Sequence, residues 1–213
     1  MTACLILSAG LQVRMRFDRT PPKQLLVVAG ETLQARQIRQ LAVHGIEPIT
    51  VTNNAQLTAV SPRPFSPQGT STILHTLRSS RALWAERTII LLGDVFYSPG
   101  LMADMVNYAG AIRFWLNGAE IFAMSFAASA AQRVLDAIDR CITATTAEWN
   151  GRTLHGDLRL WHLLRELSGL DIHRHVTILN DMTQPEVTDY TRDFDSAAAH
   201  QDFIRELPNF NVS

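Results

Sequence analysis

The sequence predicts a single α/β domain in which a mixed, mainly parallel sheet lies between two layers of helices. Apolar stretches alternate along the chain with segments of helical periodicity, as they do in parallel α/β proteins. The first stretch, ACLILSA at residues 3–9, is continuously apolar, as a central strand covered on both faces should be. Two further strand candidates flank an Asn-Gly turn, and this antiparallel hairpin makes the sheet mixed.

The size and charge of the chain fit one folded domain and argue against several kinds of partner. Its 213 residues are enough for one large domain and few for two. The net charge is -1, with no block of like charges, which disfavours a general nucleic-acid or anionic-membrane surface. The first ten residues lack the basic region of a signal peptide, so we expect a first strand and a cytoplasmic protein. Cys4 and Cys141 are isolated and are expected in the core.

In the first half of the chain, strands and helices are predicted to alternate. A helix over residues 31–45 has apolar positions at Leu33, Ile38, Leu41 and Val43, and Gly45 ends it. The other predicted elements are a strand at 46–53, a proline-rich loop or edge segment at 60–71, a helix at 71–85, and a strand at 87–97 that stops at Gly93-Asp94.

The second half begins with the predicted hairpin and ends in a helix. The expected elements are strands at 111–117 and 119–126 around Asn117-Gly118, helices at 128–141 and 155–168, a strand at 175–180, and a closing helix at 196–207. No repeat or linker interrupts this pattern. We therefore predict one domain over residues 1–213, a Rossmann-like three-layer αβα sandwich.

The loop after the first strand, SAGLQVRM at residues 8–15, is a candidate anion site. After a buried parallel strand, small residues let the backbone turn sharply and point its N–H groups at an anion. Gly10 and Arg14 would then lie at the carboxyl end of the sheet, where α/β proteins bind ligands. A plain tight turn is the alternative interpretation.

Lys23 is the only lysine in the chain, which contains eighteen arginines, and it follows two prolines. A lysine ammonium is a compact point charge, suited to a phosphate whose geometry changes during a reaction, whereas arginine would impose a planar fork. The alternative is an exposed lysine that occurs here by chance. The strong bias toward arginine favours a chemical role.

Three aspartates are candidate metal ligands. Asp94 follows a buried strand and a glycine, where a carboxylate is well placed to hold Mg²⁺ on a bound nucleotide. Asp193 and Asp195 lie on one face of an extended segment late in the chain and would supply the other side of the site. A capping role for Asp94 in the next turn, and for Asp195 or Ser196 at the last helix, is the alternative.

These segments, in this order, resemble nucleotidyltransferases of the GT-A-like superfamily. Its members include sugar-1-phosphate nucleotidylyltransferases, phosphocholine cytidylyltransferases and molybdenum-cofactor guanylyltransferases. LILSAG, RM, PKQLL and AGETL are similar to the opening motif of the superfamily, and QGTSTIL is similar to its Gly-Thr stretch beside the base. LLGDVFY resembles the metal-binding strand end, and RDFDSAAAHQDF resembles the closing segment. The resemblance covers residues 3–98 and 187–207 and is loose between them.

The resemblance implies a Mg²⁺-dependent transfer of an NMP group from an NTP to a phosphorylated small molecule, with release of pyrophosphate. Residues 1–98 would form the nucleotide-binding half, 99–186 the acceptor-binding region, and 187–213 the closing segment. Lys23 would contact the α-phosphate and the acceptor phosphate, and Arg14 the β- and γ-phosphates. The nucleotide would be held by Ser8, Ala9, Gly10, Leu11, Gln12, Gln68, Gly69 and Thr70, and Mg²⁺ by Asp94, Asp193 and Asp195.

Gln12 departs from the family pattern, because it stands where a second glycine is usual and its Cβ limits the backbone. Trp115 and Glu120 are weaker candidates for acceptor contacts. Trp115 could form part of a cage for a quaternary ammonium group, with core or interface packing as the alternative. The histidines between residues 155 and 175 lack the tightly spaced additional ligand that a zinc site needs.

We therefore predict a nucleotidyltransferase, with CTP slightly favoured and a sugar 1-phosphate, phosphocholine-like or phosphonate acceptor. One alternative is a GT-A glycosyltransferase that uses a nucleotide-sugar, although GDVF lacks the second acid of a D-x-D motif. The other is a nucleotide-binding relative without activity, suggested by Gln12. The expected partners are the NTP and the acceptor, and we expect no binding to nucleic acid or membrane. The sequence is compatible with either a monomer or a homodimer.

Overall fold

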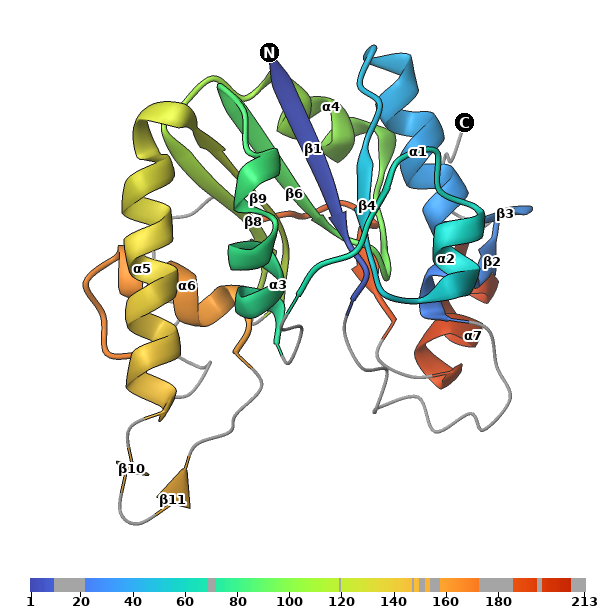
Figure 1. Ribbon diagram of the computed structural model, residues 1–213. Coiled ribbons are helices and arrows are strands. Elements are labelled where there is room, and N and C mark those ends of the chain that lie inside the picture. Colours follow the sequence, from blue (N-terminus) through green and yellow to red (C-terminus); the bar gives the residue numbers. More distant parts are fainter. Residues whose placement is uncertain are drawn as a thin grey trace.

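A six-stranded sheet forms the centre of the molecule, between two layers of helices (Figure 1). The computed structural model describes residues 1–9, 22–68, 72–118, 120–146, 148–149, 152–153, 158–172, 186–194 and 197–207. The strands of the sheet are β1 (Thr2–Leu7), β4 (Ile49–Val51), β5 (Pro64–Phe65), β6 (Arg87–Leu92), β8 (Ile112–Asn117) and β9 (Glu120–Ala127).

The order of the strands in the sheet is β5-β4-β1-β6-β9-β8. β5, β4, β1 and β6 pair in parallel, and β9 is antiparallel to both β6 and β8. The mixed, mainly parallel sheet predicted from the sequence is confirmed. The predicted hairpin is the pair β8–β9, in which Asn117 pairs with Glu120, and the proline-rich segment contributes the short edge strand β5.

Alternate residues of the central strand β1 pack into the two helical layers. Leu5 and Leu7 belong to the core cluster that includes residues of α3 (Ile73–Ser79), α5 (Ala128–Thr146) and α6 (Leu160–Leu167). Cys4 and Ile6 belong to the cluster that includes residues of α1 (Leu33–Val43) and α4 (Pro99–Asn107). Cys141, on α5, is also buried, so the predicted core positions of both cysteines are confirmed. Three layers therefore enclose a strand that is buried on both faces.

The helix α1 begins where the Thr32 hydroxyl accepts a hydrogen bond from the Ala35 backbone N–H, and the chain leaves it at Gly45, whose φ is 71°. Of the apolar positions named from the sequence, Leu33 and Leu41 are buried, whereas Val43 is 77% exposed. Polar side chains occupy much of the buried face, namely those of Gln34, Arg36, Gln37 and Gln40. This face packs against backbone carbonyls, including those of Val95 and Tyr97, as well as against apolar side chains. Buried carbonyls need hydrogen-bond donors, so side chains with N–H groups are favoured here.

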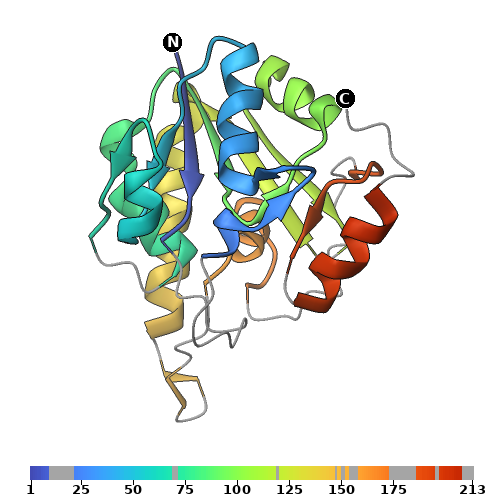
Figure 2. The ribbon, with the colours of Figure 1, turned by 90° about the vertical axis from the view of Figure 1, so that its right-hand side faces the viewer.

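A third cluster of apolar residues packs segments from the first half of the chain against its last helix. It includes Val28 of the short hairpin β2–β3 (Val27–Val28 and Glu31–Thr32), and Phe203 of the closing helix α7 (Ala197–Glu206). β12 (Arg192–Asp193) pairs antiparallel with β7 (Val95–Phe96) in the same region. Figure 2 shows α7 and β12 side by side, and the predicted closing helix is confirmed.

Several shorter elements complete the described chain. They are the 3-10 turns Lys23–Leu25 and Arg81–Leu83, the helix α2 (Ala55–Ala59), and the strands β10 (Glu148–Trp149) and β11 (Arg152–Thr153). The helix α4 was not predicted, and the strand predicted at 175–180 lies outside the described residues. Within the described ranges, no helix has the length and apolar character needed to cross a membrane.

Candidate active site

The turn between β6 and β7 presents Asp94 at the carboxyl end of the sheet, directly beside the end of β1. Gly93 precedes it, and its backbone N–H donates to the Leu7 carbonyl at 3.0 Å. A Cβ at Gly93 would lie 2.1 Å from Ser8 Oγ and 3.2 Å from the Leu7 carbonyl oxygen. Only glycine fits this close approach of the two strands. The Ser8 hydroxyl is buried here and has no hydrogen-bond partner in the described part of the chain.

Lys23 approaches the same turn from the other side. It begins the 3-10 turn that follows Pro22, and the residue as a whole is only 6% exposed. Its Nζ lies 3.6 Å from Oδ2 of Asp94, whose side chain is 29% exposed. A lysine is almost never this buried unless its charge is paired. The structure therefore brings together Lys23 and Asp94, which the sequence analysis had identified separately as candidate site residues.

Asp193 is carried to this turn by the pairing of β12 with β7. It lies opposite Val95, the residue that follows Asp94. Burial raises the pKa of the Tyr97 phenol well above its ordinary value, and the nearby negative charges of Asp94 and Asp193 also raise it. The pairing of β12 with β7 thus brings Asp193 next to the Asp94 turn, although almost half of the chain separates the two residues in sequence.

This donor set fits a magnesium ion that is held jointly with a substrate. The described residues contain no cluster of three or more His, Cys, Asp or Glu side chains that would form a metal cage. Mg²⁺ is usually bound by one or two carboxylates together with substrate phosphates and water, and it needs no such cage. Asp94 is partly exposed and Asp193 lies on the strand that pairs with the next residue, so these two carboxylates are the described residues that would hold such an ion.

Other predicted site residues are placed less completely. Ala9 follows Ser8 at the end of β1 and is half-buried, and Gln68 is exposed, with its backbone N–H donating to Ser79 Oγ at 2.8 Å. The remaining predicted positions lie outside the described residues, and they are Gly10, Leu11, Gln12, Arg14, Gly69, Thr70 and Asp195. Their roles stay predictions.

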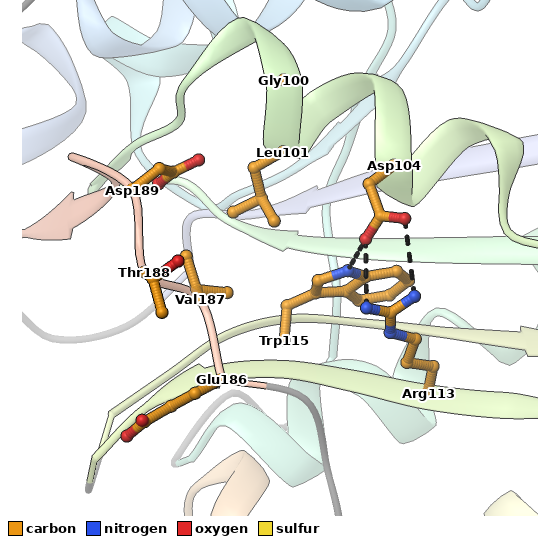
Figure 3. A pocket seen from close by; sticks show the side chains of 9 residues that line it. All are labelled: Gly100, Leu101, Asp104, Arg113, Trp115, Glu186, Val187, Thr188 and Asp189. Carbon is orange, nitrogen blue, oxygen red and sulfur yellow. Dashed lines mark hydrogen bonds and ion pairs between the residues drawn. The ribbon is translucent and has the colours of Figure 1, made fainter.

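Trp115 lines a pocket of about 210 Å³ between α4, β8 and residues 186–189 (Figure 3). Trp115 is 1% exposed as a residue, and its indole N–H donates to Asp104 Oδ2 at 2.7 Å. Arg113 pairs with the same carboxylate at 3.2 Å, and its guanidinium carbon lies 4.9 Å from the Trp115 ring centroid. A cation of the chain itself therefore already contacts this ring. Glu120 is exposed at the start of β9, and the acceptor roles of both residues stay predictions.

The sequence did not point to Tyr97 and Gln37, which hydrogen-bond to the backbone around the Asp94 turn. The Tyr97 hydroxyl donates to the Phe122 carbonyl at 2.6 Å and accepts from the Leu92 N–H at 3.0 Å, so it fixes the end of β6. Gln37 contacts the turn itself through its side-chain amide. The available signal was the recurrence of glutamine at positions 34, 37 and 40, which lie along one face of a helix.

Lys23 and Asp94 form an ion pair at the carboxyl edge of this mixed α/β sheet, which is where α/β proteins bind their ligands. The sequence matches the model of the MobA-like NTP transferase domain over residues 4–177, and the chain belongs to this family. The family match confirms the predicted class of enzyme, a nucleotidyltransferase. In a comparison with curated protein sequences, none matches the chain.

Solved structures of nucleotide-processing enzymes share the fold over nearly their whole length. A CTP:phosphocholine cytidylyltransferase from Streptococcus pneumoniae is 14% identical, with 97% of this chain and 99% of that chain covered and a TM-score of 0.63. The inositol-1-phosphate CTP transferase from T. maritima is 12% identical, with 99% and 97% covered and a TM-score of 0.58. A UDP-glucose pyrophosphorylase is 11% identical, with 98% and 99% covered and a TM-score of 0.60. At these identities the likeness concerns the fold.

Proposed function

We propose that this chain transfers the NMP group of an NTP to a phosphorylated small molecule and releases pyrophosphate, with Mg²⁺ as cofactor. In this proposal, residues 1–98 bind the nucleotide, residues 99–186 bind the acceptor, and the closing segment completes the metal site. An oxygen of the acceptor phosphate forms a bond to the α-phosphorus, and the bond from that phosphorus to the bridging oxygen of pyrophosphate breaks. The acceptor phosphate is already ionised, so the reaction needs no general base.

The observation that carries the proposal is the ion pair between the buried Lys23 and the partly exposed Asp94 at the edge of the sheet. Negative charge accumulates where the α-phosphate and the acceptor phosphate meet, and a fixed ammonium there favours the transition state. Mg²⁺, when bound by Asp94 and Asp193, supplies further positive charge to the phosphates. The lysine and the carboxylate already hold each other in place without substrate, so little reorganisation is needed when phosphates arrive.

The identity of the nucleotide and of the acceptor is a finer part of the proposal. The preference for CTP is supported by two enzymes of the same fold that use CTP, namely the cytidylyltransferase and the inositol-1-phosphate transferase described above. Sugar 1-phosphates, phosphocholine and phosphonates share a phosphate-type oxygen nucleophile, and they form the expected acceptor class. We also propose that the enzyme acts in the cytoplasm, where NTPs are available.

Pyrophosphate release tests the proposal directly. Each of the four NTPs is combined with MgCl₂ and with a panel of sugar 1-phosphates, inositol 1-phosphate, phosphocholine and phosphonates, and the nucleotidyl product is identified by mass spectrometry. We expect one NTP, most readily CTP, to react with one class of acceptor. An NTP that raises the melting temperature with Mg²⁺ but never yields pyrophosphate would indicate a nucleotide-binding protein without activity.

Substitutions of the single lysine test its assigned role. Lys23→Ala should reduce the rate by about 100-fold or more, because removal of one preorganised charge from such a site costs about 10²–10³ in rate. Lys23→Arg should restore little of it, because the planar guanidinium does not replace a compact ammonium. Arg63→Ala is the matched control, since it removes an exposed ion pair of similar length, 3.7 Å to Glu47. Near-normal turnover by Lys23→Ala would refute the assignment.

A further inference from the structure

The side-chain amide of Gln37 contacts the backbone on both sides of Asp94. Its Nε2 lies 3.1 Å from the Leu92 carbonyl oxygen, 3.3 Å from that of Gly93 and 2.9 Å from that of Val95. The residue is 1% exposed, in the middle of α1. Two amide protons thus serve three carbonyls, which makes at least one of these hydrogen bonds shared between acceptors.

These three carbonyls define the path of the chain into and out of the Asp94 turn. Buried carbonyl groups need donors, and a turn that lacks them opens or changes conformation. The close approach of Gly93 to Ser8 fixes the turn against β1, and Gln37 fixes it against α1. The direction in which Asp94 presents its carboxylate therefore depends on contacts from both sides.

Two neighbouring glutamines on the same helix make different contacts. Gln40 donates through Nε2 to the Tyr97 carbonyl at 3.1 Å, beyond the turn. Gln34 is also 1% exposed, but its Nε2 donates to Ser61 Oγ at 2.6 Å and to Thr50 Oγ1 at 3.4 Å, on the side of β4. Gln37 alone of the three bonds to the residues that immediately flank Asp94.

We propose that Gln37 is a positioning residue that sets the orientation of Asp94 toward Mg²⁺ and the nucleotide phosphates. This inference rests on the proposed function, because it assigns Asp94 to the metal. A polar residue that orients a metal ligand from behind commonly changes metal affinity or activity by about 10- to 100-fold when it is replaced. The effect of Gln37 is exerted through the backbone of the turn, without contact to substrate.

The test compares Gln37→Met with Gln34→Met in the full-length protein. Both changes remove a buried amide from α1 while they keep the length of the side chain, so both should lower the melting temperature by similar amounts. Hydrogen–deuterium exchange, followed by mass spectrometry, then reports on two segments. Gln37→Met should accelerate exchange at residues 92–97, whereas Gln34→Met should accelerate it at residues 50–61 and leave residues 92–97 unchanged.

The second readout is the requirement for magnesium. In Gln37→Met, the MgCl₂ concentration for half-maximal pyrophosphate release should rise by about 10- to 100-fold. The rise in melting temperature caused by MgCl₂ with CTP should shrink in parallel, while Gln34→Met behaves like the wild type in both measurements. Equal magnesium requirements in the two variants, or unchanged exchange at residues 92–97 in Gln37→Met, would overturn the inference. A wild-type protein that shows no response to any NTP would instead refute the proposed function, and the exchange data alone would then decide whether Gln37 fixes the turn.

Discussion

Replacement of Gly93 by alanine should destabilise the protein because of the space beside Ser8, and not because of backbone strain. Gly93 is not among the described glycines with a positive φ, so its backbone conformation suits alanine. The new methyl group, however, would lie 2.1 Å from Ser8 Oγ and 3.0 Å from Gln24 Cγ. A separation near 2 Å forces neighbouring atoms to move, and overpacking of this kind costs about 1–3 kcal/mol. The strands β1 and β6 would separate slightly at the point where the candidate site begins.

A double-mutant cycle isolates this contact. Ser8→Ala alone should cost less than about 1 kcal/mol, because the buried hydroxyl has no hydrogen-bond partner in the described chain. In Gly93→Ala/Ser8→Ala, the closest clash is gone while the contacts at 3.0 and 3.2 Å stay, so about half or more of the loss should be recovered. Urea unfolding followed by tryptophan fluorescence measures each free energy, with a shift of about 1 M in the midpoint for 2 kcal/mol. Strictly additive effects, or a fully stable Gly93→Ala, would refute the steric argument.

Two further predictions concern groups away from the turn. Hydrogen bonding and the positive charge of Arg39, with a contribution from Arg36, lower the pKa of Glu31 in the folded protein from its ordinary value of 4.5. The ion pair therefore stabilises the fold above pH 4.5, and this stabilisation is lost as the pH falls through the lowered pKa of the folded state. In urea titrations at pH 7, the free energy of unfolding of Glu31→Gln should be lower than that of the wild type by about 1 kcal/mol or less. This difference should shrink below pH 4.5, and a difference that does not change with pH would contradict the argument. Cys4 and Cys141 are fully buried, and burial raises the pKa of both thiols, that of Cys141 to about 12. A thiol reagent should therefore label them only in denaturant, and rapid labelling of the native protein would show that one is accessible.

Much of the fold was accessible from the sequence because its strands have simple hydrophobic patterns. Residues 3–7 and 89–92 are apolar runs, and they lie in the central strands β1 and β6. The pairing of β12 with β7 agrees with the prediction that Asp193 and Asp94 contribute to one site, although the roles of these residues stay predictions. For the central strands local composition was enough, because both faces of the sheet are covered by helices and most of their residues are buried.

The inner face of α1 could not be predicted in the same way. Residue hydropathy alone places Val43 inside and Gln37 outside, whereas the structure has Val43 exposed and Gln37 buried on the same helix face as Leu33 and Leu41. The reason lies on another element, since a backbone turn at the end of β6 offers carbonyl groups that only a donor can satisfy. The helix α4 was overlooked although Ser98-Pro99 is a regular helix start, in which Ser98 Oγ accepts from the Leu101 N–H at 3.0 Å.

The pairing of β12 with β7 also determines when the candidate site can first exist during synthesis. Every strand of the central sheet lies within residues 2–127, so a nascent chain can contain the complete sheet long before its last residues leave the ribosome. At that stage Asp193 has not yet been translated, and the strand β7, which follows Asp94, has no β12 to pair with. A chain truncated before Arg192 would thus contain all six strands of the central sheet but would lack Asp193, together with Phe194 and Phe203 of the third apolar cluster.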